Sequence, residues 1–454
     1  MNTTTDWRAY LPQLQEQNAQ IEAANEKKVN QLCIKRGLRN ADGTGVLAGI
    51  TAIGSVQGYS MLDGERLPMK GELYYRGISA AEIVAAHQAE NTFGYEEVVY
   101  LLLMGKLPNA EQYAAFQNTL AEKRTLPVGF QEDILFKAPA ANLMNQIQRG
   151  IIGLYAYDEA PDDLSAENLL RQSVELVARM PAIVANSYAI MRHYIQGHSL
   201  HIHHPKAELS AAENFLRMAR KDKEYTDSEA KLLDLMLIIH AEHGGGNNST
   251  FACRAVSSTG TDTYSAVAAA VASLKGPLHG GANAKVVEMM RLLTAEIGTS
   301  PTDEALRAYL SRLLDGSAGD RSGKLYGLGH AVYTLSDPRA EAVKTYARTV
   351  AAEKGRLDEL ELLERIETLG CALIAEKKRS DAPLCANVDL YSGMVYGMLN
   401  IPEALFTPLF AMARTAGWCA HRMEEVLTGH RIMRPAYRAL RLKQPYLPMS
   451  ERST

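Results

Sequence analysis

Apolar residues recur every three to four positions over most of the chain, which is the spacing of amphipathic helices. Residues 94–127 fit two such helices, separated at Gly105–Asn109. Residues 166–197 fit one long helix, which we expect to bend or break near Pro181 because proline removes a backbone donor. The same spacing continues at residues 227–243 and 261–276.

Strand-like sequence is confined to two stretches, "GVLAGITAIGSVQG" at residues 45–58 and "GELYYRG" at residues 71–77, which together predict a small ribbon. No internal repeat or low-complexity tract interrupts the helical pattern. The expected fold class is therefore all-α, with many tightly packed helices.

The length of 454 residues predicts more than one domain. Composition shifts between about residues 290 and 382, where the segment "SRLLDGSAGDRSGKLYG" is rich in Gly, Ser and charge. We interpret this piece as a small domain inserted into a larger one. The predicted divisions are a helical leader at 1–40, a large helical domain at 41–282 and 390–454, and a small helical domain at 283–389, with hinges near Gly280–Gly281 and Pro383–Asn387.

Charge is balanced, since 48 basic and 52 acidic residues give a net charge of −4, which argues against nucleic acid as the main partner. The five cysteines form no CxxC motif and are odd in number, which indicates reduced thiols rather than disulfides or structural zinc. The N-terminus lacks the apolar core of a signal peptide, and no apolar run reaches transmembrane length. A cytoplasmic location without a nucleic-acid or membrane partner is therefore expected.

The segment "HAEHGGGNNST" places His240 and His243 three residues apart, so we expect them to share a helix face. A metal site, as in a metallohydrolase, would need a third ligand that the neighbouring sequence does not supply. The alternatives are a plain helix end before a polar loop, or a site where His243 and Asn247 face a bound polar ligand. The histidines at 201–204 are interpreted as a surface loop.

The segment "GPLHGGANAKV" places His279 between a Gly-Pro break and the start of a new helix. Unpaired N–H groups at a helix N-terminus disfavour a cationic imidazole. A neutral His279 would donate one hydrogen bond, which suits the polarisation of a carbonyl and the stabilisation of an enol.

The segment "GLGHAVYTLSDPRA" places His330 after a Gly-x-Gly loop that lacks the pattern of nucleotide-binding loops. Asp337-Pro338 predicts an N-cap and first helical residue, so Arg339 falls in the first turn. A cation there opposes the helix dipole, which suggests a bound carboxylate or phosphate, although an ordinary ion pair would also explain it.

The segment "NVDLYSGMVYGMLNIP" places Asp389 at the start of an apolar helix. Asp389 could serve as a plain helix cap, but apolar surroundings would raise its pKa into the range of a general base. Arg414 lies inside an apolar run, and Arg434 follows in "GHRIMRPAYR". Because buried arginine requires a partner, Arg339, Arg414 and Arg434 could together bind a dicarboxylate.

Taken together, these segments and "ARTAGWCAHRMEE" resemble the citrate synthase family, in the family's order and over about residues 45–440. The resemblance implies condensation of acetyl-CoA with oxaloacetate and hydrolysis of citryl-CoA to citrate and CoA, the reaction that feeds the tricarboxylic acid cycle. It implies an acyltransferase with no cofactor and no metal.

The resemblance also implies residue roles. Asp389 would take a proton from the methyl group of acetyl-CoA, His279 would hydrogen-bond the thioester oxygen, and His330 would polarise the ketone of oxaloacetate and protonate the alkoxide. The residues expected to hold oxaloacetate are His243, Asn247, Arg339, Arg414 and Arg434. The residues expected to bind CoA are Lys324, Gly327, Gly329, Lys377 and Asn387.

Arg434 resembles the arginine that this family supplies from the partner subunit, which implies a homodimer. The large domain would carry the dimer contacts and the oxaloacetate site. The small domain would bind CoA and close over the cleft, which would exclude water.

Two other functions are compatible with the sequence. A 2-methylcitrate synthase would use propionyl-CoA with the same residues, and a pocket distinguishes one methyl group by only about 1–3 kcal/mol. An inactive paralogue acting as a binding protein would be expected to lack one of His279, His330 and Asp389, and all three are present. The sequence assigns no role to residues 1–40 and indicates nothing about allosteric control.

Overall fold

The computed structural model describes residue 8 and residues 11–63, 65–379, 382–429, 431–439 and 443–452. The chain forms two compact units, one of residues Ile50–Ile432 and one of Met1–Gly49 with Met433–Thr454. Arg434 belongs to the unit of the two termini, whereas every other predicted site residue belongs to the larger unit. The proposed division of the larger unit at residues 283–389 stays a prediction.

The terminal unit contains the helix that its sequence predicts, α1 (Leu11–Gln31), whose described side chains are exposed. It also contains the short helical turns η2 (Arg36–Leu38) and η7 (Met449–Glu451). No helix in the described part of the chain is long and apolar enough to span a membrane.

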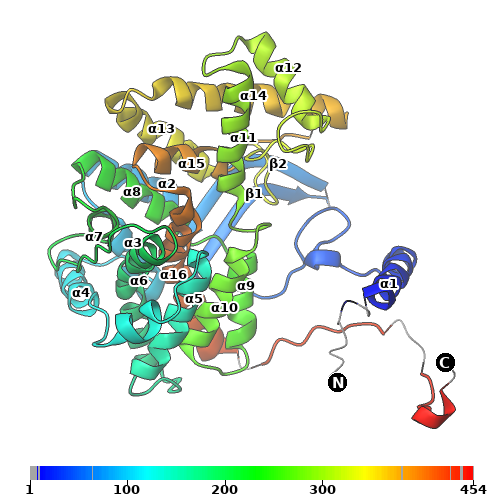
Figure 1. Ribbon diagram of the computed structural model, residues 1–454, viewed down its shortest axis with the longest axis horizontal. Coiled ribbons are helices and arrows are strands. Elements are labelled where there is room, and N and C mark those ends of the chain that lie inside the picture. The colour runs from blue at the N-terminus through cyan, green and yellow to red at the C-terminus, as the bar shows by residue number, and fades with distance from the viewer. Residues whose placement is uncertain are drawn as a thin grey trace. The chain divides into compact units, whose positions relative to one another are not determined.

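The larger unit is built almost entirely of helices, so the all-α expectation is confirmed (Figure 1). Its α-helices are α2 (Ala80–Glu90), α3 (Tyr95–Met104), α4 (Ala110–Lys123), α5 (Leu143–Gly153), α6 (Ala166–Tyr194), α7 (Ala211–Ala219), α8 (Asp227–His240), α9 (Asn248–Ser257), α10 (Thr263–Lys275), α11 (Ala282–Ile297), α12 (Asp303–Leu314), α13 (Pro338–Glu353), α14 (Leu357–Lys378), α15 (Asp389–Met398) and α16 (Phe406–Glu424). Shorter turns are η3 (Gln131–Phe136), η4 (Leu154–Tyr157), η5 (Glu403–Leu405) and η6 (Glu425–Gly429).

Local sequence signals set several of these boundaries. Helix α3 ends at Gly105, whose φ of 82° is readily available only to glycine, and α4 begins after a capping box formed by Asn109 and Gln112. The predicted pair of helices is therefore confirmed. Of the expected bend or break at Pro181, the break is wrong because α6 continues through it, and the bend stays a prediction. Pro181 is buried, and packing of α6 against α5, α7 and α16 compensates for the missing backbone bond.

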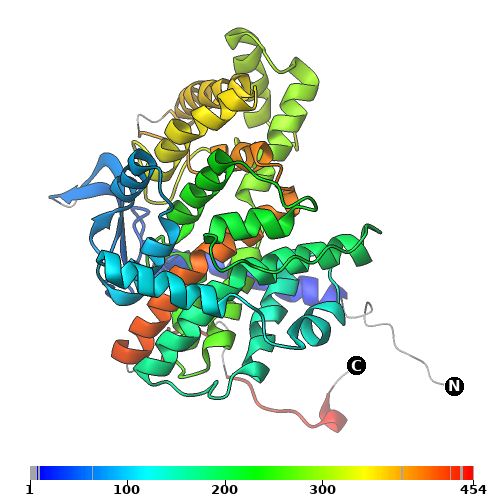
Figure 2. The same cartoon turned by 90° about the vertical axis from the view of Figure 1, so that its left-hand side faces the viewer.

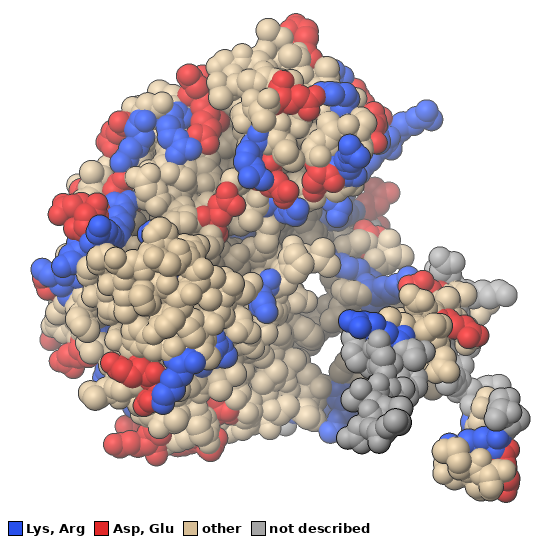
Figure 3. Space-filling view, in the orientation of Figure 1, with Lys and Arg blue, Asp and Glu red and all other residues tan. Residues whose placement is uncertain are grey.

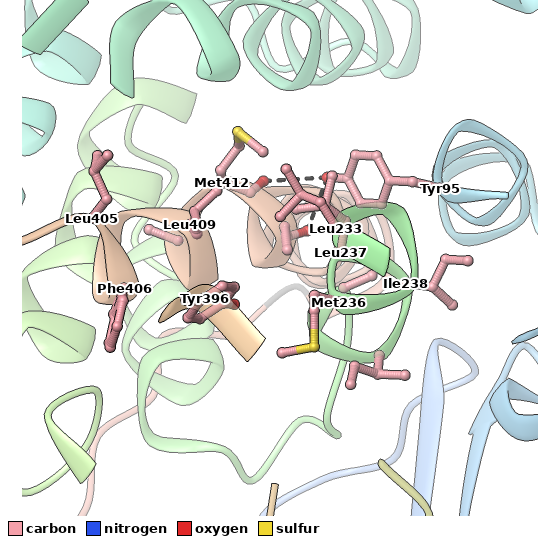
Figure 4. Close-up of a cluster of buried hydrophobic side chains, with 14 of the residues drawn as sticks. Tyr95, Leu233, Met236, Leu237, Ile238, Tyr396, Leu405, Phe406, Leu409 and Met412 are labelled. Carbon is pink, nitrogen blue, oxygen red and sulfur yellow. Dashed lines mark hydrogen bonds between the residues drawn. The ribbon is translucent and has the colours of Figure 1, made fainter. Parts of the chain in front are cut away.

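Helix α16 lies in the middle of the larger unit and contacts α3, α6, α8, α9 and α10 (Figures 1 and 2). Its side chains are buried along most of its length. Figure 4 shows Leu409 and Met412 of α16 among side chains of α8, and Tyr95 of α3 reaching the backbone of α16. The Tyr95 hydroxyl lies 3.2 Å from the carbonyl oxygen of Met412 and 3.1 Å from that of Ala413, which fixes the turn just before Arg414.

The predicted ribbon is present as an antiparallel sheet of β1 (Gly54–Leu62), β2 (Glu65–Tyr75) and β3 (Ile78–Ser79), in which β1 lies later and β2 earlier in the chain than predicted. Its outer face holds the segment after His330, because the Thr334 hydroxyl bonds backbone groups of Gly58 and Met69. A Cβ at Gly71 would lie 2.1 Å from the carbonyl oxygen of Ser336. The two glycines therefore let residues 332–336 lie directly on the ribbon.

The substitution Gly71→Ala should lower the free energy of unfolding by about 1–3 kcal/mol, because the new methyl group meets backbone that cannot move aside. Urea denaturation measures the change. Gly45→Ala is the matched control, since a Cβ there meets no atom within 4 Å. Equal stability of the two variants would contradict close packing of the ribbon on residues 332–336.

Candidate active site

Two loops that carry predicted catalytic residues are joined by backbone hydrogen bonds. The N–H of Gly329 donates to the carbonyl of Cys385 at 2.8 Å, and the N–H of Asn387 donates to that of Gly327 at 2.9 Å. The Asn387 side chain adds a 2.8 Å bond to the carbonyl of Gly329. These bonds fix the loop before His330 against the loop before Asp389.

Three of the residues predicted to bind CoA, Gly327, Gly329 and Asn387, lie in this paired-loop structure. The structure does not bring the two lysines into it, because Lys324 is exposed and Lys377 bonds Asp315 at 2.9 Å. Figure 3 shows lysine and arginine side chains interspersed with acidic ones on the visible face. A surface lysine that is already ion-paired is a weak candidate for a phosphate contact.

His330 has its protonation pattern set by the backbone. Its Nδ1 accepts hydrogen bonds from the N–H groups of Val332 at 3.0 Å and Tyr333 at 3.1 Å. An imidazole nitrogen that accepts two bonds carries no proton, so the proton resides on Nε2. The ring stacks on Tyr333 with a centroid distance of 4.5 Å and lies 5.3 Å from the ring of His243.

Asp389 is the first residue of α15, and its N–H donates to the Asn387 side chain at 3.0 Å. Burial raises the pKa of Asp389, the positive charge of Arg339 lowers it, and the negative charge of Asp337 raises it, with a net value of about 6. Asp389 is half-buried as a residue. Asp389 thus has the raised pKa that suits a general base.

The ring of His279 is kept neutral by burial and by the nearby charge of Arg414, and it contacts the start of a helix that does not follow it in sequence. Its Nε2 lies 3.3 Å from the N–H of Ser249 and 3.1 Å from Oδ1 of Asn247, at the N-terminus of α9. Burial, with Arg414 nearby, lowers the pKa of His279 to about 4. The sequence predicted that the start of the following helix would keep His279 neutral, and this stays a prediction. The helix N-terminus that the ring contacts is that of α9.

His240 and His243 do not share a helix face, so that expectation is wrong. Helix α8 ends at His240, and the chain then turns toward Gly244, whose φ is +80°. The Nδ1 of His240 bonds the carbonyl of Met236 at 2.7 Å, whereas Nε2 of His243 is buried with no hydrogen-bond partner among the described residues. No cluster of three potential metal ligands occurs in the described ranges, and residues 201–204 form an irregular, mostly half-buried segment.

Arg414 is fully buried in α16 and lacks an ionic partner in the described part of the chain. Its Nε donates to the carbonyl of His240 at 2.5 Å, and its guanidinium lies 4.6 Å from the ring centroid of Phe410. Both terminal nitrogens, Nη1 and Nη2, are buried without a hydrogen-bond acceptor. Burial lowers the pKa of Arg414 to about 10, which still leaves it charged at neutral pH.

Arg339 forms an ion pair within the protein, which is one of the two explanations that the sequence allowed. Its Nε and Nη2 bond the two carboxylate oxygens of Asp337 at 3.0 and 2.7 Å. Asp337 also caps α13 and accepts a bond from the N–H of Val388 at 3.2 Å, next to Asp389. The Asp337–Arg339 pair therefore connects the start of α13 to the start of α15.

One hydrogen-bonded network of charged and polar side chains was not predicted from the sequence. Oε1 of Glu242 lies 2.8 Å from Nε2 of His421 and accepts the N–H of Gly244 at 2.6 Å. Nδ1 of His421 accepts from Arg254 at 2.9 Å, and Arg254 also binds Glu424 at 2.7 Å. This network of side chains holds the turn after His243 in place. The only sequence signal was an acidic residue between two histidines, and its partner is 179 positions away.

Known proteins are similar to this chain in sequence and in fold. The family model described as "Citrate synthase, C-terminal domain" matches residues 41–436. The chain belongs to the citrate synthase family. Its expected acyltransferase-type activity is thereby confirmed.

Relatives agree along most of the chain. Citrate synthase from Deinococcus radiodurans is 37% identical over 75% of this chain and 84% of its own length. A 2-methylcitrate synthase from Shewanella oneidensis is 31% identical over 80% of this chain and 87% of its own length.

Solved structures agree as well. Citrate synthase from Pyrobaculum aerophilum has a TM-score of 0.75 and 30% identity, with 92% of this chain and 95% of that chain covered. Citrate synthase from Thermoplasma acidophilum, in a ternary complex with carboxymethyl coenzyme A and oxaloacetate, has a TM-score of 0.72 and 26% identity, with 92% and 99% covered.

A citrate synthase that uses Asp389 as its base should lose kcat/KM as the pH falls through about 6, because protonation removes the base. The raised pKa of Asp389 also affects stability, because ionisation of the carboxyl favours activity but destabilises the fold. Since the folded pKa lies above the unfolded one, the ionised carboxylate destabilises the fold above about pH 6. Asp389→Asn should therefore abolish turnover and raise the melting temperature at pH 8, with the gain vanishing toward pH 4.

The matched control is Asp63→Asn, which removes an exposed carboxylate. Its pH–rate profile and melting temperature should follow those of the unmodified chain. A profile that is flat between pH 5 and 8 would contradict the assignment of the base.

Proposed function

We propose that this chain condenses acetyl-CoA with oxaloacetate and hydrolyses the resulting citryl-CoA to citrate and CoA. The observation that carries the proposal is that Nη1 and Nη2 of Arg414, and Nε2 of nearby His243, are buried without a hydrogen-bond partner among the described residues. A buried charge without a partner is costly, so the site favours a ligand that brings an anion. Oxaloacetate supplies two carboxylates.

Proton removal from acetyl-CoA would be shared by two groups. Asp389, with its pKa near 6, is largely ionised at neutral pH and would take a proton from the methyl group. When Nε2 of His279 accepts from Ser249, the proton of the neutral ring is on Nδ1. That N–H would hydrogen-bond the thioester oxygen and stabilise the enol.

Carbon–carbon bond formation would then occur at the ketone of oxaloacetate. The Nε2–H of His330, held in this tautomer by two backbone N–H groups, would polarise the ketone and protonate the new alkoxide. Arg414 and His243 would hold a carboxylate, and Asn247 and Arg339 complete the proposed oxaloacetate site. Water then cleaves the thioester and releases CoA. No step transfers electrons, so the chemistry needs no redox cofactor, and none of the proposed roles requires a metal.

CoA would lie along the paired loops that contain Gly327, Gly329 and Asn387. Closure of residues 283–389 over the cleft would exclude water before condensation. Lys324 and Lys377 complete the proposed CoA contacts. Lys377 would first have to break its ion pair with Asp315.

We further propose that the enzyme is a cytoplasmic homodimer that feeds the tricarboxylic acid cycle. The need for more than one cation on a dicarboxylate supports a contribution from the partner subunit's Arg434.

The alternative, a 2-methylcitrate synthase, is supported by the relative from Shewanella oneidensis. Purified enzyme with oxaloacetate should release CoA from acetyl-CoA with a much higher kcat/KM than from propionyl-CoA, as followed with a thiol reagent. Comparable or better use of propionyl-CoA would favour the alternative. Absence of CoA release from both substrates, in a folded protein, would favour an inactive paralogue.

A hybrid-dimer experiment tests the role of Arg434. Arg434→Ala and Asp389→Asn should each be inactive alone. Mixed and reassociated, they should recover about one quarter of the unmodified activity, since half of the dimers then contain one site with both residues intact. No recovery, despite mass-spectrometric evidence of hybrids, would contradict a shared site.

A further inference from the structure

The hydroxyl of Tyr333, near Arg414 and His243, is a further buried polar group without a hydrogen-bond partner among the described residues. Tyr333 is 3% exposed, and its hydroxyl has no hydrogen-bond partner among the described residues. Its ring stacks on His330 at 4.5 Å and meets the edge of His243 at 5.6 Å. The neighbouring buried tyrosine, Tyr75, differs, because its hydroxyl donates to the carbonyl of Ile238 at 2.8 Å.

Packing of the ring does not require the hydroxyl. A Cβ at Gly71 would lie 2.6 Å from Cδ1 of Tyr333, and a Cβ at Gly58 would lie 2.6 Å from its Cα, so the ribbon holds the residue through its ring and backbone. Phenylalanine would fill the same space without the cost of an unsatisfied buried hydroxyl. A tyrosine at this position therefore points to a ligand that accepts a hydrogen bond from its hydroxyl.

The surroundings favour an anionic acceptor. The guanidinium of Arg339 lies 5.6 Å from the centroid of the Tyr333 ring, and Arg414 acts on the hydroxyl electrostatically. Burial raises the pKa of Tyr333, so the hydroxyl stays protonated at neutral pH and can only be satisfied in full by an acceptor. The carboxylate that acts electrostatically on Tyr333, Asp337, does not fill this role because it is bound to Arg339.

We propose that the Tyr333 hydroxyl donates a hydrogen bond to a carboxylate oxygen of bound oxaloacetate, at the end of the molecule held by Arg414 and His243. The inference rests on the proposed function, because it names a further contact to the same substrate. Tyr333 would thus bind substrate directly, while its ring fixes the orientation of His330.

The test is Tyr333→Phe, with Tyr309→Phe as matched control. Tyr309, on α12, is also buried with an unpartnered hydroxyl, but no proposed site residue lies on its helix. Oxaloacetate binding is measured by calorimetry. Because Tyr333→Phe loses a hydrogen bond to a charged group, its affinity for oxaloacetate should fall about 10-fold to 100-fold. The affinity of Tyr309→Phe for oxaloacetate should be unchanged. KM for oxaloacetate should rise while kcat changes little.

Two further measurements separate substrate binding from a structural role. Without ligand, the melting temperature of Tyr333→Phe should equal or exceed that of the unmodified enzyme. A fall of several degrees, or failure to fold, would show that the hydroxyl has a structural partner and overturn the proposal. Succinate, which has two carboxylates and no ketone, should lose affinity by the same factor as oxaloacetate. A loss confined to oxaloacetate would place the contact at the ketone and overturn the carboxylate assignment.

The proposed function and this inference fail in different ways. If the unmodified enzyme does not bind oxaloacetate, the proposed function is wrong and the inference falls with it. If the unmodified enzyme binds and Tyr333→Phe binds equally well, only the role of Tyr333 is overturned.

Discussion

The constraint on which the larger unit depends is the burial of α16 with its charged residues. Three of its buried side chains, Arg414, His421 and Arg422, carry polar groups that water cannot reach. Arg422 is satisfied by Thr263, Ser257 and the carbonyl of Thr261, at 3.0, 3.2 and 2.6 Å. Each bond ties α16 to a neighbouring helix or loop, so the surrounding architecture is fixed by the need to satisfy these groups.

Arg414 differs from the other buried polar residues of α16 because its hydrogen-bond donors are not all satisfied. This difference indicates where the proposed oxaloacetate site lies. The fold satisfies only its Nε and leaves its two terminal nitrogens, like Nε2 of His243 and the hydroxyl of Tyr333, without a partner among the described residues. Removing a guanidinium from water and leaving it unpaired costs stability. Such a cost is tolerated at functional sites, where a substrate completes the interaction.

Preorganisation is the second theme of the structure. The protonation of each proposed acid–base group is set by something other than substrate: backbone N–H groups for His330, burial and Arg414 for His279, and burial for Asp389. The paired loops and the ribbon beneath residues 332–336 hold these groups at fixed positions. Donors that are already oriented need no reorganisation when charge develops in the reaction.

The sequence by itself determined what depends on neighbours along the chain. Helical periodicity, the capping box of α4 and the Asp337-Pro338 start of α13 arise from contacts within a few residues, so they could be predicted. The identity of the candidate site residues also followed from motifs, because particular chemistry requires particular side chains at each position.

The tertiary structure decided what depends on distant partners. It brought His279 to α9 rather than α11, placed His243 beyond the end of α8, kept α6 intact at Pro181, and paired Arg339 with Asp337. It also joined Glu242 to His421 and left the Tyr333 hydroxyl without a partner. The physical reason is that burial and pairing are properties of three-dimensional neighbours, and one sequence records which groups are available but not which of them meet.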